Sequence, residues 1–330
     1  MNARAPRRLV RWRRRRARRS PWARPARVPR PLQGVAAGLG VAALIGLLSW
    51  SGLFAWPERA ALDRFQEMRV RLGHSMGSAA DPLVIAVDEP ALDAIGAWPW
   101  PRETLARLID RLGEAGAGAI GLAIRLPNPA ADPISDIALA EAMRRAGRVV
   151  VAAEPVVVTL GDAREPGIRF ASPIPLLAGA ARALGHITLS ADSDGTLRRV
   201  ALYTAPPAAE GASVPAPQVP ALALSLARVQ AESAGVSLSP AMPFERGASV
   251  LLSLRPTARP GPEGLATTLS AAEFLREGPD ASLPQLGGRP VLIGVTAPDV
   301  PDVPHYRLPL PGLERVPAVY IHAAAARQIL

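Results

Sequence analysis

Short apolar runs alternate with amphipathic segments through most of the chain after residue 80. Continuous apolar runs of strand length predict buried strands at 83–88, 119–126, 148–158, 248–254 and 289–295. Apolar residues spaced three and four apart predict helices at 103–115, 136–146, 219–234, 269–276 and 318–330. Strands that alternate with helices of this length are typical of βαβ units, so we predict an α/β fold with a mixed, largely parallel sheet flanked by helices. Because strands recur at both ends and can share one sheet, we predict one domain over residues 81–330.

The middle of this region is less regular. Two β-like runs, 185–190 and 196–204, flank the sequence DSDG, which predicts a turn between them. A Pro- and Ala-rich stretch, 205–220, then predicts a loop.

An uncharged segment of membrane-spanning length precedes the domain. The 27 residues 31–57 carry no formal charge, and their densest apolar part, 35–54, matches the hydrocarbon thickness of a bilayer. Trp50 and Trp56 lie at its distal end, where indole rings favour the membrane interface. We therefore predict one N-terminal transmembrane helix over 32–56 and a connector helix over 57–80. A buried core helix and a cleaved signal peptide are the alternatives, and the length of the apolar part favours a retained anchor.

The charge distribution sets the expected orientation. Residues 1–31 contain 13 arginines and no acidic residue, whereas the formal charge of the whole chain is +10. The remainder is therefore mildly acidic. The positive-inside rule predicts a cytoplasmic Arg-rich tail over 1–31 and a periplasmic or extracellular domain, anchored in the inner membrane. We expect the tail to contact anionic lipid rather than nucleic acid, because it adjoins the predicted span and has few interleaved stacking residues.

Candidate chemistry is sparse. The absence of cysteine excludes a disulfide framework, a thiol nucleophile and a thiolate zinc site. The four histidines (His74, His186, His305 and His322) have no metal-ligand spacing, and no nucleophile elbow, P-loop or dinucleotide fingerprint is present. We therefore expect no catalytic residues, no metal and no cofactor.

Two groups of residues are the best candidates for a ligand site. Asp88 and Glu89 follow the first strand at its carboxyl end, where open α/β sheets place ligands. Trp98 and Trp100 could stack on a ligand, with Arg102 binding an anion beside a helix N-terminus. The alternative, which we favour, is structural: the tryptophans cap the core, and Arg102 pairs with a carboxylate such as Asp88 or Glu89.

Several segments carry a resemblance to a known family. They are DPLVIAVDEPALDAIGAWPWPR (81–102), GAGAIGLAIRL with the helix after Asp136, DGTLRRV (194–200), and VLIGVTAPDVPD with the C-terminal PGLERVPAVYIHAAAARQIL. They resemble the second type of CHASE domain, the cyclase/histidine-kinase-associated sensory extracellular domain, over roughly residues 60–330. We add Asp194, in the third segment, to the candidate ligand residues. The chain also departs from the pattern of the family it resembles, because relatives commonly carry an Asp where this chain has Ala123.

The resemblance implies a sensory input module without catalytic activity. Such domains are usually followed by further membrane helices and a cytoplasmic cyclase or kinase, whereas this chain stops at Leu330. The expected partners are the lipid bilayer, an extracytoplasmic signal, a cyclase or kinase output and, as an open question, a second copy in a homodimer. A membrane-anchored periplasmic hydrolase and a structural cell-envelope protein are the alternative functions.

Overall fold

The computed structural model describes the larger part of the chain. The described residues are 35, 38–43, 46–47, 55–71, 81–159, 166–204, 218–238, 248–254, 262–276, 283–301 and 303–330. The chain divides into two compact units, residues 1–60 and 61–330. The predicted tail and most of the predicted span lie outside the described residues. Within the described part, no helix is both long and apolar enough to cross a membrane.

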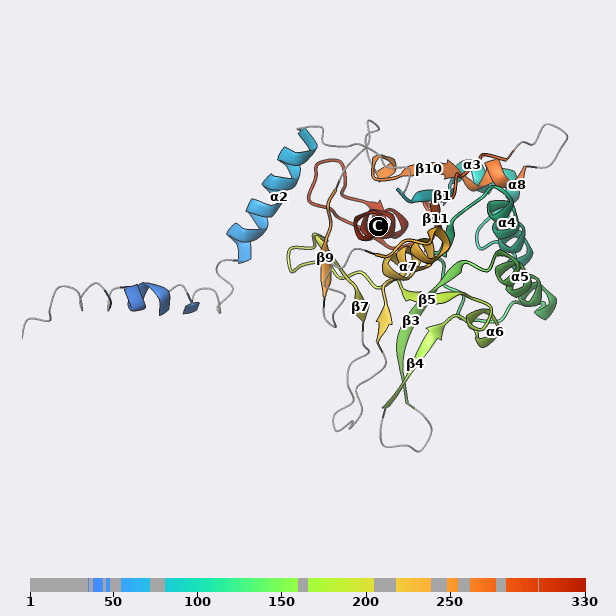
Figure 1. Cartoon of the computed structure of the whole chain (residues 1–330), viewed down its shortest axis with the longest axis horizontal. Coiled ribbons are helices and arrows are strands. Elements are labelled where there is room, and N and C mark those ends of the chain that lie inside the picture. Colours follow the sequence, from blue (N-terminus) through green and yellow to red (C-terminus); the bar gives the residue numbers. More distant parts are fainter. Residues whose placement is uncertain are drawn as a thin grey trace, which may run out of the picture. The chain divides into compact units, whose positions relative to one another are not determined.

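A parallel sheet forms the centre of the second unit (Figure 1). Six of its described strands run parallel in the order β10-β1-β11-β2-β3-β5. Their bounds are β1 Leu83–Val87, β2 Ala119–Leu122, β3 Val149–Thr159, β5 Ala183–His186, β10 Thr267–Ser270 and β11 Pro290–Val295. Strands from both ends of the domain therefore share one sheet, with β1 between two strands from the C-terminal region.

One antiparallel strand extends this sheet. After a register shift between Glu154 and Pro155, the second half of β3 pairs with β4 (Pro166–Ser172). The predicted mixed, largely parallel sheet flanked by helices is thus confirmed.

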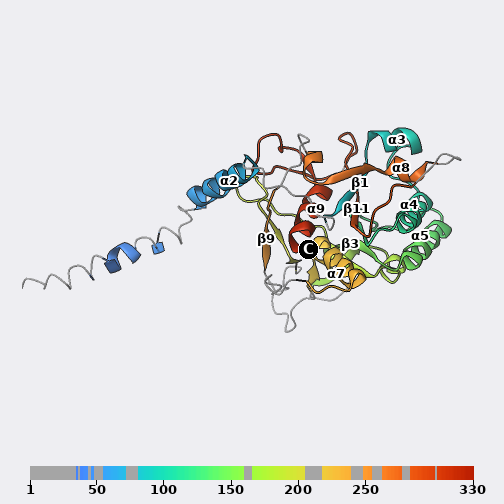
Figure 2. The ribbon, with the colours of Figure 1, turned by 45° about the horizontal axis from the view of Figure 1, so that its top comes forward.

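Helices cover both faces of the sheet. The described α-helices of the chain are α2 Ala55–Arg71, α3 Glu89–Ile95, α4 Arg102–Glu114, α5 Pro133–Ala146, α6 Pro175–Ala178, α7 Leu222–Ala234, α8 Ala271–Leu275 and α9 Ala318–Ile329. Figure 2 shows α4 and α5 on one side of the strands and α7 and α9 on the other.

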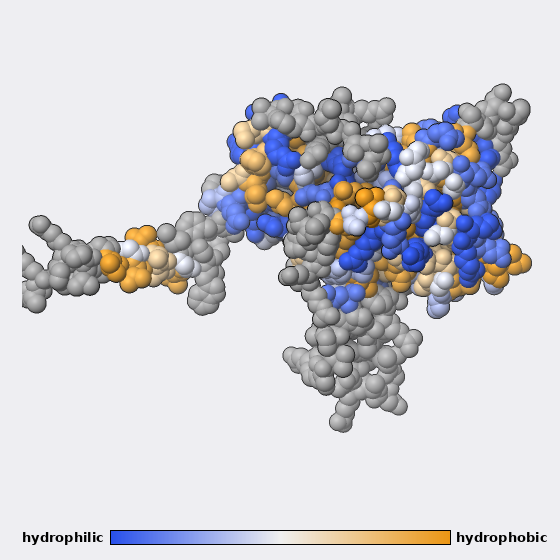
Figure 3. All heavy atoms as spheres, viewed as in Figure 1, coloured by the Kyte–Doolittle hydropathy of each residue, from blue (hydrophilic) through white to orange (hydrophobic). Residues whose placement is uncertain are grey.

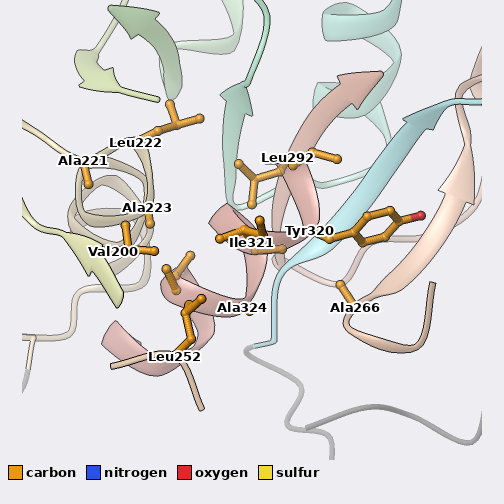
Figure 4. Close-up of a cluster of buried hydrophobic side chains, with 14 of the residues drawn as sticks. Val200, Ala221, Leu222, Ala223, Leu252, Ala266, Leu292, Tyr320, Ile321 and Ala324 are labelled. Carbon is orange, nitrogen blue, oxygen red and sulfur yellow. The ribbon is translucent and has the colours of Figure 1, made fainter. Parts of the chain in front are cut away.

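Alternation along the strands explains this layering. Leu83, Ile85 and Val87 of β1 belong to the core that contains α4, α5 and α8, whereas Val84 belongs to the core that contains α7 and α9. Successive side chains of a strand point to opposite faces, so a strand that is apolar throughout needs cover on both. Figure 4 shows part of the second core, with Ile321 of α9 beside Leu292 of β11.

The outer faces of the helices are polar. In α4 the buried stripe includes Leu105, Leu108 and Leu112, while Glu103 and Arg107 are exposed. Hydrophilic residues accordingly cover much of the surface over α4 and α5 (Figure 3). This division is the one expected of a helix that packs one face on a sheet.

The DSDG turn, predicted between two β-like runs, does not connect the two strands of a hairpin. The first run supplies β5 of the main sheet, whereas β6 (Arg199–Ala201) pairs with β9 (Ser249–Leu251). Nearby, β7 (Tyr203–Thr204) pairs with β8 (Val219–Pro220), and β12 (His305–Tyr306) pairs with β13 (Val316–Pro317). The DSDG turn therefore connects the sheet to a separate small ribbon.

Candidate functional site

The carboxyl ends of four parallel strands surround a cavity of about 440 Å³, which we call the tryptophan cavity. Its walls come from the segments that follow β11, β2 and β5, from Glu154 in β3, from the loop before α4 and from the start of α9. Carboxyl ends of parallel strands meet at one edge of a sheet, and open α/β folds place ligands in the crevice there. The volume is within the range of small-molecule sites.

Trp98 and Trp100 form one wall of this cavity. Trp100 is 3% exposed, and its Nε1 donates a hydrogen bond to the carbonyl of Gly96 at 2.9 Å. The Trp98 ring is half-buried and packs edge-to-face on Trp100, with centroids 5.7 Å apart. Trp100 thus belongs to the core, as the structural interpretation predicted, while Trp98 presents aromatic surface to the cavity.

Arg102 lies in the same wall but has a different partner from the one we predicted. Its Nε donates to Asp136 of α5 at 3.2 Å, and it also donates to the carbonyl of Asn128 at 3.1 Å. The carboxylate of Asp136 is 4% exposed and accepts a further bond from the backbone of Ala130. The predicted pairing of Arg102 with a carboxylate is thus confirmed, but the partner is Asp136 rather than Asp88 or Glu89, because α5 packs against α4.

A second charged pair contributes to the cavity wall. Arg125 lies 3.5 Å from Glu154, with side chains 46% and 30% exposed. Tyr306 lines the same cavity, and burial, followed by the charge of Glu154, raises the pKa of its hydroxyl against an opposing effect of Arg125. This part of the cavity is polar, in contrast to the wall that contains Trp98.

His322 of α9 is the buried polar residue of the cavity. It is 0% exposed, and neither ring nitrogen has hydrogen-bond geometry with any residue in the described part of the chain. Burial, together with the nearby His186, lowers its pKa to about 3 despite a small opposing effect of the Ile187 backbone. Burial likewise lowers the pKa of His186 to about 4. Both imidazoles are therefore neutral at pH 7.

Asp88 and Glu89 lie in another cavity of about 450 Å³, which also contains His305, Arg315 and Tyr320. Asp88 caps α3 by accepting a hydrogen bond from the Ala91 backbone at 3.0 Å, and its Oδ1 accepts a second from Ser270 at 2.6 Å. The carboxylate of Asp88 thus joins β1, α3 and the end of β10.

Asp194 lies in neither cavity. Arg198 donates hydrogen bonds to the carboxylates of Asp194, Asp192 and Asp63 of α2. The shortest nitrogen–oxygen distances to the three are 2.8 to 2.9 Å. The Arg198 side chain is 5% exposed, and the hydrogen bonds, that to Asp63 foremost, raise its pKa. We call these four residues the Arg198 cluster. The candidate ligand residues thus divide among three places, and only Trp98, Trp100 and Arg102 come together in the tryptophan cavity.

Comparison with known families decides the identity. The model of the CHASE2 domain matches residues 39–330, most of the chain. The chain belongs to the CHASE2 family. Comparison with curated proteins and with solved structures gave no match. CHASE2 domains are sensory extracellular domains of signalling proteins.

Within this CHASE2 domain, several residues of the cavity were missed from the sequence. Arg125 and Glu154 lie inside the runs predicted as strands, 119–126 and 148–158, so the carboxyl-end criterion that selected Asp88 did not point to them. Tyr306 and His322 carry no local signal, because the fold alone brings them to this edge of the sheet.

The cavities of this CHASE2 domain can be compared with the composition of known ligand sites. Among the described residues, no group of three or more His, Asp or Glu side chains is placed to hold a metal ion. The tryptophan cavity combines aromatic walls with a few polar groups, which is the usual composition of a small-molecule site.

Proposed function

We propose that the chain is the membrane-anchored input module of a bacterial signal-transduction protein. The domain binds a signal outside the membrane and passes a conformational change to a cytoplasmic output such as a nucleotide cyclase or kinase. Family membership supports the sensory role. The 13 arginines ahead of a long apolar segment support the anchor and its orientation.

The contacts of α2 and α9 with one short segment carry this proposal. Gln66 of α2 is 6% exposed and donates a hydrogen bond to the carbonyl of Leu252. From α9, Gln328 accepts a bond from the Ser253 backbone at 2.9 Å, and Arg327 donates to the Ser253 carbonyl at 3.2 Å. The helix that follows the proposed anchor and the last helix of the chain are thus held by adjacent residues, which we call the junction.

The Arg198 cluster strengthens the hold on α2. Arg198 pairs with Asp63 through two hydrogen bonds of 2.8 Å, and its carbonyl accepts a bond from the backbone of Leu252. A movement of α2 therefore changes contacts of the same segment that α9 contacts.

Helix α9 also reaches the tryptophan cavity. Its first two turns supply Ala318, Val319 and His322 to the cavity wall, whereas Arg327 and Gln328 in its last turn contact the junction. His322 and Arg327 are five residues apart, about 7.5 Å along a helix. A ligand that displaces α9 would alter the junction directly, and a coupling of about 1–3 kcal/mol is typical of allosteric proteins.

A reporter fusion tests this function. The chain is joined after Leu330, through a membrane helix, to a nucleotide cyclase, and cyclase output is measured in cells. Gln66→Ala removes the bond between α2 and the junction, and Asp63→Asn weakens the pairing of α2 with Arg198, whose carbonyl bonds to Leu252. We call these two the junction variants and expect each to change output at least about fivefold. Arg64→Gln is the matched control, since the Arg64 side chain is 80% exposed on the same helix. Output equal to that of the unaltered chain in both junction variants would contradict the proposal.

A further inference from the structure

The tryptophan cavity has an aromatic wall suited to a flat ligand. Trp98 and Trp100 both line the cavity, and the Trp98 ring is half-buried, so part of its surface is open to a ligand. Tyr306 adds a third aromatic side chain. Aromatic rings pair by stacking or by edge-to-face contact. A ring of similar size fits a volume of about 440 Å³ lined in this way.

Arg125 is the guanidinium of the cavity that an incoming anion can reach, in competition with Glu154 at 3.5 Å. Two guanidinium groups, those of Arg102 and Arg125, line it together with one carboxylate, that of Glu154. Asp136, which neutralises Arg102, is 4% exposed and does not belong to the lining. Guanidinium groups bind carboxylates by charge-assisted hydrogen bonds, and Arg125 is accessible at 46% exposure.

His322 calls for a second polar group on the ligand. A buried polar atom without a partner is uncommon in folded proteins and indicates an occupant that supplies the missing hydrogen bonds. The Ile187 backbone raises the pKa of this fully buried ring as a hydrogen-bond partner would, but neither nitrogen makes a bond of normal geometry within the described residues. The ring lies in the cavity wall. A neutral imidazole offers one donor and one acceptor, which a hydroxyl group can satisfy.

We propose that the tryptophan cavity binds a small aromatic carboxylate with a hydrogen-bonding group remote from the carboxylate, such as a phenolic hydroxyl. The ring packs on Trp98, the carboxylate binds at Arg125, and the remote group bonds to His322. This inference rests on the proposed sensory function and specifies the chemical class of its signal.

A matched ligand series tests the class on the full chain in lipid nanodiscs, with affinity measured by calorimetry and ligand-observed NMR. The probe is 4-hydroxyphenylacetate. We expect 4-hydroxyphenylacetamide, which lacks the charge, to bind about tenfold more weakly. Phenylacetate, which lacks the hydroxyl, should bind roughly threefold to tenfold more weakly. Equal affinity for the acid and its amide would overturn the carboxylate assignment, and equal affinity with and without the hydroxyl would overturn the role of His322.

Substitution locates the site. Arg125→Gln should weaken binding of 4-hydroxyphenylacetate about tenfold, whereas Arg144→Gln, on the exposed face of α5, should leave it unchanged. Arg125 is exposed, so its replacement leaves the core intact. Binding that is insensitive to Arg125→Gln, or no binding of any member of the series, would overturn the inference. If that occurs while junction substitutions still alter cyclase output, the sensory function stands and the ligand class alone fails.

Discussion

The two buried histidines give the domain a specific acid sensitivity. Their pKa values are about 3 for His322 and about 4 for His186, against an ordinary value of 6.5. Below pH 6.5 the unfolded chain therefore binds protons that the folded chain does not. Stability is complete above about pH 6.5 and declines as the pH falls toward 4, and each unit of pKa difference contributes about 1.4 kcal/mol.

We accordingly expect the free energy of unfolding to fall by several kcal/mol, in order of magnitude, between pH 7 and pH 4. Urea denaturation at a series of pH values measures this loss. His186→Gln, which removes one titrating ring, should show a shallower decline over the same range. An identical decline in the variant would show that other groups cause the acid sensitivity.

Substitution of Trp100 tests the structural role of residues 81–102, the first of the segments that resemble the CHASE2 family. Because its side chain is 3% exposed within the core, Trp100→Ala should destabilise the domain by about 3–5 kcal/mol. Trp98→Ala is the matched control, because that ring is half-buried and its removal should lower the stability of the domain less. Thermal unfolding measures both. An equal melting temperature for Trp100→Ala and the unaltered chain would contradict the core assignment.

At the level of the elements, strand β5 and helix α7 pack closely against each other. A Cβ on Gly185 would clash with the backbone of Leu222, the first residue of α7, whereas a Cβ on Gly113 of α4 would meet nothing within 4 Å. Overpacking in such a site typically costs about 1–3 kcal/mol or more, because backbone cannot move aside as a side chain can. Alanine also favours a helix over glycine by about 1 kcal/mol.

Gly185→Ala should therefore destabilise the domain, and Gly113→Ala should stabilise it slightly. Denaturant midpoints of the two variants, set against the unaltered chain, measure the difference. If Gly185→Ala were neutral, the close approach of β5 to α7 would be wrong.

The elements differ in how much of them the sequence predicts. β1, α4, β11 and α9 have long or purely apolar patterns, and the structure has them within one or two residues of the expected bounds. The predicted helix at 269–276 begins instead at Ala271, because the four preceding residues form the edge strand β10. That strand is half-buried and ends in Ser270, which caps α8 with Glu273, so its pattern resembles a helix start.

At the scale of the molecule, sequence patterns predict one sheet but not its strand order. The order β10-β1-β11 places C-terminal strands on both sides of β1 and brings the start of α9 to the carboxyl edge. The site consequently draws on segments far apart in the chain. Trp98 and Arg102 could be predicted as neighbours, since a few residues separate them, whereas His322 joins them through long-range packing that no local pattern records.

The central claim is tested most directly by determining on which side of the membrane the domain lies. The chain has no cysteine, so single cysteines at Arg18→Cys in the tail and Arg144→Cys on exposed α5 can be labelled selectively. A maleimide that does not cross the inner membrane is added to intact cells and, separately, to lysed cells. We expect Arg144→Cys to react in intact cells and Arg18→Cys to react only after lysis. Protection of Arg144→Cys until lysis, with Arg18→Cys reactive in intact cells, would contradict an extracytoplasmic sensory domain.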